Sequence, residues 1–196
     1  MQTLSSEYWN KRYQNNEIQW SLGKVSTPLK AYIDQLGDKS IKILIPGAGN
    51  GYEAEYLFKK GFENVYVVDV SRIALKNLNR RVPGFPKEQL INSDFFEFQV
   101  KSGFDLILEQ TFFCALKPKL RTDYVLKTYA LLKKKAKIVG LMFDFPLTEK
   151  GPPFGGSIAE YEALFRPKFQ IDKMEPCFNS DTSRQGKELF VMFTKN

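Results

Sequence analysis

The sequence predicts an α/β fold in which a mostly parallel sheet is covered by helices on both faces. Strand-like apolar runs alternate with helical patterns through residues 41–143, an alternation typical of parallel strands joined by crossover helices. The last two strand-like runs, residues 169–175 and 188–194, are joined by a polar loop too short for such a helix, so we expect them to pair antiparallel. With 196 residues, 43% hydrophobic and 26% charged, the chain has the composition of a single globular domain spanning residues 1–196.

Two amphipathic segments open the chain. The first covers residues 7–14, and the second begins at residues 26–28, where Ser and Thr precede a proline that suits a first helical turn. The first residues lack the apolar core of a secretory leader, and no apolar run approaches the ~20 residues that cross a bilayer. The two cysteines, Cys114 and Cys177, are too few for a disulfide framework. We therefore expect a cytoplasmic protein with no membrane partner.

The central segment repeats a strand–turn–helix unit. An aliphatic run at residues 41–45 leads into a glycine-rich turn, helix-forming residues follow at 53–60, and Gly61 closes that helix. A β-branched run and a helix capped by Ser71 come next. The remaining strands are predicted at residues 65–70, 89–92, 105–109 and 136–143, and the remaining helices at residues 72–81, 118–133 and 157–165. Seven strands result, the last of them antiparallel.

The composition excludes several kinds of chemistry. Because the chain has no histidine, it holds no Ser-His or Cys-His nucleophile, no imidazole base and no zinc site of the His-containing type, and we expect no metal. A net charge of +7 would suit nucleic acid or small anions. Much of the excess lies at Lys133, Lys134, Lys135 and Lys137, which we place at a solvated helix end, where the helix dipole favours cations.

Three glycines stand where the first strand turns into its helix. In Gly47-x-Gly49-x-Gly51 the missing side chains would let a ligand approach closely, and amide groups at the helix start would attract an anionic group. Asp69 ends the next strand, eighteen residues after Gly51, where a carboxylate can accept both hydroxyl hydrogens of a ribose. A dinucleotide fingerprint has its third glycine one residue later, where Tyr52 stands, so the spacing favours S-adenosylmethionine over NAD.

An acidic and aromatic pair follows the third strand. Asp94 can accept from an adenine amino group, and Phe95 can cover the adenine ring. Taken singly, each feature has an ordinary structural explanation, since glycines make tight turns and Asp94 can cap a helix. The ordered set of glycine turn, Asp69 and Asp94 favours a nucleoside pocket.

These segments, with others spread over nearly the full length, resemble the thiopurine methyltransferase family, and more closely its branch of plant and microbial halide and thiol methyltransferases. The GPPF sequence at residues 151–154 is the most distinctive of the similar stretches. The others are residues 8–13 (YWNKRY), 18–20 (IQW), 26–29 (STPL), 45–51 (IPGAGNG), 94–96 (DFF), 104–107 (FDLI), 113–116 (FCAL) and 183–188 (SRQGKE).

The resemblance implies a Rossmann-like class I methyltransferase whose N-terminal helices, residues 1–36, form a lid over S-adenosyl-L-methionine. The cofactor contacts that it implies are Trp9, Tyr13 and Trp20 in the lid, Gly47 at the methionine part, Asp69 at the ribose, Asp94 and Phe95 at the adenine, and Gln110 beside the cofactor. Two positions depart from the halide and thiol branch, which usually has tryptophan at Tyr13 and tyrosine at Gln110. Thiopurine-type enzymes commonly have arginine at the latter position. Trp9 and Trp20 have an alternative role as helix or loop anchors.

Candidate walls for a methyl acceptor follow the fourth and fifth strands, because ligands bind outside the carboxyl ends of parallel strands. They are Phe112, Phe113, Cys114 and Phe154. Ordinary core packing is the alternative for the two phenylalanines after the fourth strand. Cys114 is a poor nucleophile, since no histidine activates it. A thiol of pKa ~8.5 is already partly ionised near neutrality, so a thiol, hydrosulfide or halide acceptor needs no strong enzymic base.

The function that we expect is S-adenosylmethionine-dependent methyl transfer to a small soft nucleophile: a thiol, a hydrosulfide, a halide or a thiopurine-like aromatic thiol. Two alternatives stay open. The basic charge and the many aromatic residues suggest an RNA methyltransferase, and a non-catalytic module that only binds the cofactor has the same pocket. We expect a monomer whose partner is the small-molecule substrate, with no nucleic acid.

Overall fold

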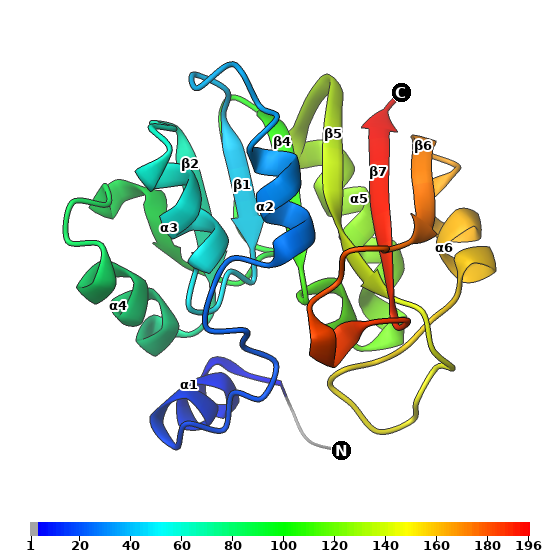
Figure 1. The fold of residues 1–196 in the computed structure, drawn as a ribbon, viewed down its shortest axis with the longest axis horizontal. Coiled ribbons are helices and arrows are strands. Elements are labelled where there is room, and N and C mark those ends of the chain that lie inside the picture. Colours follow the sequence, from blue (N-terminus) through cyan, green and yellow to red (C-terminus); the bar gives the residue numbers. More distant parts are fainter. Residues whose placement is uncertain (1–3) are drawn as a thin grey trace.

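The computed structural model describes residues 4–196 and contains a seven-stranded sheet with the strand order β3-β2-β1-β4-β5-β7-β6 (Figure 1). Residues 1–3 of the predicted lid lie outside the described residues. The strands are β1 (Ile43–Pro46), β2 (Val65–Asp69), β3 (Leu90–Asn92), β4 (Phe104–Gln110), β5 (Leu132–Phe143), β6 (Phe169–Pro176) and β7 (Glu188–Lys195). The first five pair in parallel, and β7 runs antiparallel to both β5 and β6. The predicted fold class is confirmed, including the antiparallel last strand.

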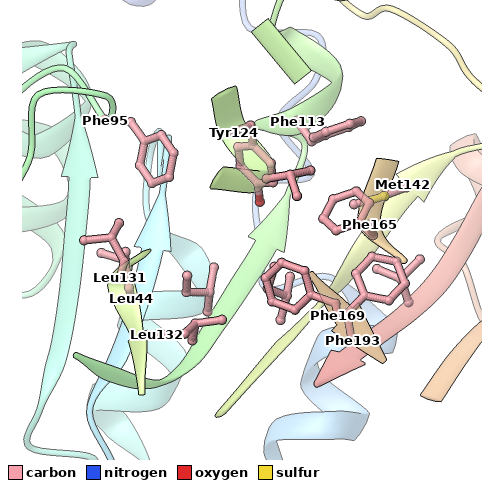
Figure 2. Close-up of a cluster of buried hydrophobic side chains, with 14 of the residues drawn as sticks. Leu44, Phe95, Phe113, Tyr124, Leu131, Leu132, Met142, Phe165, Phe169 and Phe193 are labelled. Atoms are coloured by element: carbon pink, nitrogen blue, oxygen red, sulfur yellow. The ribbon is translucent and has the colours of Figure 1, made fainter. Parts of the chain in front are cut away.

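Helices cover both faces of the sheet, because its strands alternate apolar side chains between two cores. One core joins the sheet to α2 (Thr27–Ile33), α3 (Tyr52–Lys59) and α4 (Arg72–Arg81). The other joins it to α5 (Arg121–Leu131) and α6 (Ile158–Phe165) and contains a run of packed aromatic rings (Figure 2). In that second core Phe165 stacks on Phe193 of β7 with ring centroids 4.6 Å apart.

Local sequence signals begin and end these helices as expected. The Ser71 hydroxyl accepts from the backbone N–H of Ala74 at the start of α4, and Ser157 caps α6 in the same way. Pro28 lies in the first turn of α2, and Gly61 follows α3 with a φ of 85°. The predicted helices and strands are therefore confirmed within a few residues at their ends, apart from the region around residue 133.

The structure predicted for the lysine-rich segment is wrong. The helix predicted over residues 118–133 consists of a 3-10 turn, η3 (Pro118–Leu120), and α5, which ends at Leu131. Lys133 and its neighbours therefore lie in the first part of β5 instead of at a helix end. Leu132 is buried and pairs with Phe104 of β4, which forces the chain into an extended path at once. Lys135, with a φ of 62°, absorbs the register shift that follows.

The N-terminal helix α1 (Ser6–Gln14) lies at the end of the sheet toward which β1 points (Figure 1). It has no buried residue. Asn10 attaches it to the rest of the chain, because its Oδ1 accepts from the Ser71 hydroxyl at 2.9 Å and from the N–H of Ile73 at 3.2 Å. Within residues 4–196 no helix combines the length and apolar character needed to span a bilayer.

Candidate functional site

A cavity of ≈ 790 Å³ opens at the carboxyl ends of β1, β2, β4 and β5. Segments far apart in the sequence line it: the lid residues around α1, the glycine turn, the ends of β2 and β4, and the loops that flank β5 and β7. The predicted cofactor residues that line it are Trp9, Tyr13, Trp20, Gly47, Gly49, Asp69, Asp94, Phe95 and Gln110. Gly51 does not line it.

The glycine turn is shaped by the protein's own side chains. The φ angles of Gly47, Gly49 and Gly51 are 54°, 54° and 66°, which side-chain-bearing residues rarely adopt. A Cβ at Gly47 would overlap the ring of Phe112, and one at Gly49 would lie 2.6 Å from the Tyr13 hydroxyl. The amides of Gly47 and Gly49 donate to Val68 and Asp69. The missing side chains of Gly47 and Gly49 therefore make room for the rings of Phe112 and Tyr13, which line the cavity. The amide N–H groups of both glycines already donate hydrogen bonds within the protein.

Asp69 braces this turn and faces the cavity. Its Oδ2 accepts from the N–H of Gly49 at 2.8 Å, and its Oδ1 accepts from the N–H of Ser71 at 2.7 Å. Burial raises the pKa of Asp69 to about 6, although both amide bonds favour the ionised form. A carboxylate has about four acceptor positions, and these bonds use two of them. Asp69 can therefore accept further hydrogen bonds from a ligand in the cavity.

The ends of β3 and β4 contribute a second pair of polar groups. Asp94 follows β3, is exposed, and accepts from the N–H of Phe96 at 2.7 Å. Phe95 is buried, with its ring edge-on to Phe112 at 5.2 Å. Gln110 ends β4, and its buried Oε1 has no hydrogen-bond partner among residues 4–196. Because buried polar atoms are rarely left unpaired, this amide oxygen marks a place for a ligand or water donor.

Glu109 supports the site from outside the cavity lining, and sequence reasoning missed it. It is fully buried, and its Oε1 accepts from the N–H groups of Phe112 and Phe113 at 2.8 and 2.9 Å. Its Oε2 accepts from the Tyr124 hydroxyl at 2.7 Å. Burial raises the pKa of Glu109 to about 7. The carboxylate fixes the turn after β4, where Thr111 has a φ of 59°. An acidic residue inside an apolar strand was the signal that could have found it.

The predicted acceptor walls divide into two groups. Phe112 and Cys114 line the cavity, whereas Phe113 packs in the core against Tyr124 at 5.1 Å, and Phe154 lies against Gly151 outside the lining. Burial raises the pKa of the Cys114 thiol far above its ordinary value, which agrees with its low expected reactivity. Phe143, the last residue of β5, and Phe145, two residues later, also line the cavity, with their ring centroids 5.2 Å apart. Sequence reasoning did not name them.

Three lid aromatics meet over the cavity. Trp20 makes edge contacts with Trp9 and Tyr13, at ring-centroid distances of 5.5 and 5.8 Å. The Arg12 guanidinium carbon lies 5.1 Å from the Trp20 ring centroid, within the range of a cation–π contact. Tyr13 as a whole is half-buried, but its hydroxyl is well covered; burial of the hydroxyl raises its pKa, and the nearby Asp69 charge raises it further. The predicted lid therefore presents three aromatic rings to the cavity, together with polar side chains that include Arg12 and Lys24.

Basic residues outnumber acidic ones around the cavity. The basic lining residues are Arg12, Lys24, Lys117, Lys119, Arg184 and Lys187, and the acidic ones are Glu53, Asp69 and Asp94. Most of the basic residues come from the loops after β4 and before β7, away from Asp69. That end of the cavity therefore favours an anion. Within residues 4–196 there is no cluster of side chains able to hold a metal ion.

Comparison with known proteins matches this architecture to one family. The thiopurine S-methyltransferase family model matches residues 4–194. A probable thiol methyltransferase 2 of Arabidopsis thaliana is 30% identical over 171 residues, which cover 85% of this chain and 75% of the relative. A thiopurine S-methyltransferase of Vibrio cholerae is 28% identical and covers 95% of this chain and 96% of its own.

A similar fold occurs in a solved structure. The crystal structure of 1,6-didemethyltoxoflavin-N1-methyltransferase from Burkholderia thailandensis, with bound 1,6-didemethyltoxoflavin and S-adenosylhomocysteine, superposes with a TM-score of 0.75. It covers 97% of this chain and 87% of its own, at 17% sequence identity. At that identity the similarity concerns the fold.

Proposed function

This chain belongs to the thiopurine S-methyltransferase family, and we propose that it transfers a methyl group from S-adenosylmethionine to a small thiol-type nucleophile. A thiol, a hydrosulfide, a halide and a thiopurine-like aromatic thiol are the acceptors in question. The observation that carries the proposal is that the predicted cofactor residues, apart from Gly51, gather around one cavity.

The residues present fit the cofactor. The buried, unpaired Oε1 of Gln110 and the spare acceptor positions of Asp69 offer hydrogen-bond acceptors to a nucleoside and an amino acid moiety. Acidic groups stand at the β2 and β3 side of the cavity, where Asp69 would hold the ribose and Asp94 the adenine. When bound, S-adenosylmethionine supplies an activated methyl group on a sulfonium leaving group. The volume of ≈ 790 Å³ lies within the range typical of ligand pockets.

The chain's own contribution is orientation and exclusion of water. Holding two reactants in a near-attack arrangement is worth roughly 7–11 kcal/mol. Trp9, Tyr13 and Trp20 close one side of the cavity, and Phe143 and Phe145 line its other end. Removing water from a soft anion strengthens its interactions inside the cavity and raises its reactivity. We propose residues 4–24, the part of the predicted lid that precedes α2, as the lid that does this, because α2 packs in the core against the sheet.

Neither Glu109, beneath the cavity, nor Cys114, in its lining, is suited to act as a strong base. Both oxygens of Glu109 are occupied by Phe112, Phe113 and Tyr124, and the pKa of Cys114 is raised by burial. A thiol of pKa ~8.5 does not need such a base, because a useful fraction ionises near neutral pH. The lysines at the β4 and β7 side of the cavity, Lys117, Lys119 and Lys187, would favour the ionised acceptor.

The experiment that tests the proposal is an acceptor panel. The protein is incubated with methyl-labelled S-adenosylmethionine and, in separate tubes, hydrosulfide, thiocyanate, iodide, an aromatic thiol and RNA. We expect labelled product from one or more of the small nucleophiles and none from RNA. Product from RNA alone would support the RNA methyltransferase instead. Tight binding of S-adenosylhomocysteine with no product from any tube would support a non-catalytic module.

The lysine-rich segment bears on the RNA alternative. Lys133 lies at the amino end of β5, where it pairs with Asp105 at 2.8 Å, whereas the cavity lies at the carboxyl ends of the strands. The lysine run therefore does not serve the cavity, and the basic residues that do line the cavity suit a small anionic acceptor. We therefore propose a cytoplasmic, monomeric enzyme of small molecules, without a nucleic-acid partner.

A further inference from the structure

A buried arginine joins the lid to the edge of the sheet. Arg184 ends η4 (Thr182–Arg184), in the loop between β6 and β7, and is 7% exposed. Its Nη1 lies 3.1 Å from Oε1 of Glu188, which is also buried, at the start of β7. Its Nη2 donates to the carbonyl oxygen of Trp20, 164 residues earlier in the chain. One guanidinium therefore links a sheet strand to the centre of the lid aromatics.

Arg184 suits this role because of its forked shape. Two of its nitrogens bind two partners at once, and hydrogen bonds from a charged donor are roughly twice as strong as neutral ones. A buried ion pair by itself contributes little to stability, because the cost of removing two charges from water offsets their attraction. The bond to Trp20 is an additional contact that the ion pair with Glu188 orients. The arrangement is therefore better suited to fixing the position of Trp20 than to holding the core together.

The same loop holds the lid segment at a second place. Asp181 accepts from the N–H of Thr27 at 3.0 Å and from its hydroxyl at 3.1 Å, and it pairs with Lys24 at 2.8 Å. These contacts lie nearer the surface, where ion pairs contribute little. Arg184 is thus the buried attachment of the segment between Trp20 and Thr27, and Asp181, which is partly buried and pairs with the exposed Lys24, is the second one.

The position of Trp20 matters because the lid has little apolar burial of its own. No residue of α1 is buried, and Trp20 supplies the edge contacts that connect Trp9 with Tyr13. Asn10 fixes the lid at the α4 end of the cavity, and the Trp20 carbonyl is fixed at the β7 end. Without the Arg184 bond, the aromatic cluster would be held by Asn10 at one end and, at the other, only by the Asp181 contacts to Lys24 and Thr27, which lie beyond Trp20.

We propose that Arg184 is a positioning residue that holds the lid over the cavity through the carbonyl of Trp20. It acts on Trp20, and the catalytic consequence rests on the proposed function: with a loosened lid, water enters and methyl transfer slows. The attachment itself is a contact between two parts of the chain and does not depend on that function.

Tryptophan fluorescence reports on this attachment directly, since Trp9 and Trp20 are the two tryptophans of the chain and both lie in the lid. We would compare acrylamide quenching of the ligand-free wild type with Arg184→Gln, and with the double variant Arg184→Met, Glu188→Gln, which leaves no unpaired buried charge. Arg166→Gln is the matched control, because Arg166 also pairs with a glutamate, Glu162, at 2.9 Å, but both of these side chains are exposed, at the end of α6.

The expected result is a severalfold larger quenching constant in both Arg184 variants, with far-ultraviolet circular dichroism like that of the wild type and of Arg166→Gln. In the acceptor assay, kcat should fall more than the KM of the acceptor rises. Wild-type quenching in a folded variant would overturn the proposal, and so would unfolding of both variants, because the guanidinium would then serve the core. Calorimetric titration of the wild type with S-adenosylhomocysteine tests the proposed function separately.

Discussion

The sheet and the lid of this protein are held in place by different physical means. Every residue of β1 is buried, and the aromatic side chains of α5, α6 and β7 pack into a continuous core (Figure 2). The lid helix α1 buries none of its residues and depends on a few polar contacts and edge-on aromatic rings. Burial is worth about 25 cal/mol per Å² of apolar surface, whereas a net hydrogen bond is worth about 1 kcal/mol. Stability should therefore be a property of the sheet, and closure of the site a property of the lid.

The largest effect is expected in the aromatic core. Phe165 is fully buried and packs on Phe193, so Phe165→Ala should lower the free energy of unfolding by about 3–5 kcal/mol. Urea unfolding followed by circular dichroism measures this. Leu126→Ala, at a side chain that is 48% exposed, is the control and should change little. Equal losses in both variants would mean that the core does not dominate stability.

The second effect concerns Glu109, which lies near the end of β4 and binds the turn that follows. Burial raises the pKa of Glu109 to about 7, above its ordinary 4.5, so the folded state binds this proton more tightly than the unfolded state. Its contribution to stability is therefore full below pH 4.5 and is lost as the pH rises through about 7. Glu109→Gln does not titrate, and it should gain stability relative to the wild type by at most about 1.4 kcal/mol per pH unit across that window.

Urea unfolding of both proteins at a series of pH values between 5 and 8 checks this prediction. The difference in free energy of unfolding should move in favour of the glutamine variant as the pH rises. Glu162→Gln, on the exposed surface of α6, serves as the control. A difference that is independent of pH would show that Glu109 is ionised throughout in the folded protein.

The third prediction tests ligand binding separately from folding, at the carboxyl end of β2. Asp69→Ala removes the carboxylate that we assign to the ribose, and affinity for S-adenosylhomocysteine should weaken by about 1–3 kcal/mol. Calorimetry measures the affinity. Asp105→Ala is the control. Asp105 lies near the amino end of β4, away from the cavity, and like Asp69 it accepts a hydrogen bond from a backbone N–H, that of Lys42, at 2.9 Å. If both variants bind like the wild type, Asp69 does not contact the ligand.

The division between sheet and lid also explains what the sequence could predict. Strands appear as apolar runs and helix starts as capping residues, so the order of elements, the Ser71 cap and the antiparallel last strand follow from local pattern. The glycine turn and Asp69 were recognised because their spacing follows from the strand–turn–helix unit. Local pattern could not predict contacts between residues that are far apart in the sequence. Arg184 donates to the Trp20 carbonyl, 164 residues away, and no spacing rule connects the two.

Two other differences between the predicted and the observed structure arise because local effects compete with each other. The helix before Lys133 ends early because burial of Leu132 against β4 outweighs the favourable placement of lysines at a helix end. Phe113 and Phe112 are neighbours in the same turn, but a 3-10 segment, η2 (Phe113–Ala115), turns the first into the core and leaves the second beside Gly47. The side on which each ring falls depends on the Glu109 bonds to both N–H groups, which the sequence does not reveal.

The smallest effect tests the lid at its other attachment. Asn10→Ala removes the oxygen that accepts from the Ser71 hydroxyl and from the N–H of Ile73, so lid docking should weaken by about 1 kcal/mol, the value of a typical hydrogen bond. Because Ser71 still caps α4 and still donates its N–H to Asp69, the free energy of unfolding should stay within about 0.5 kcal/mol of the wild type, as at ordinary surface sites.

Acrylamide quenching of the two lid tryptophans and calorimetry with S-adenosylhomocysteine measure the docking, and urea unfolding measures stability. Asn15→Ala is the matched control, because Asn15 follows the end of α1 and its amide donates within the lid segment, to Glu17 at 3.2 Å. A loss of stability as large as the loss of affinity would show that the lid is part of the cooperative fold. Unequal losses, with affinity the more affected, would show that this protein separates the folding of its sheet from the closing of its site.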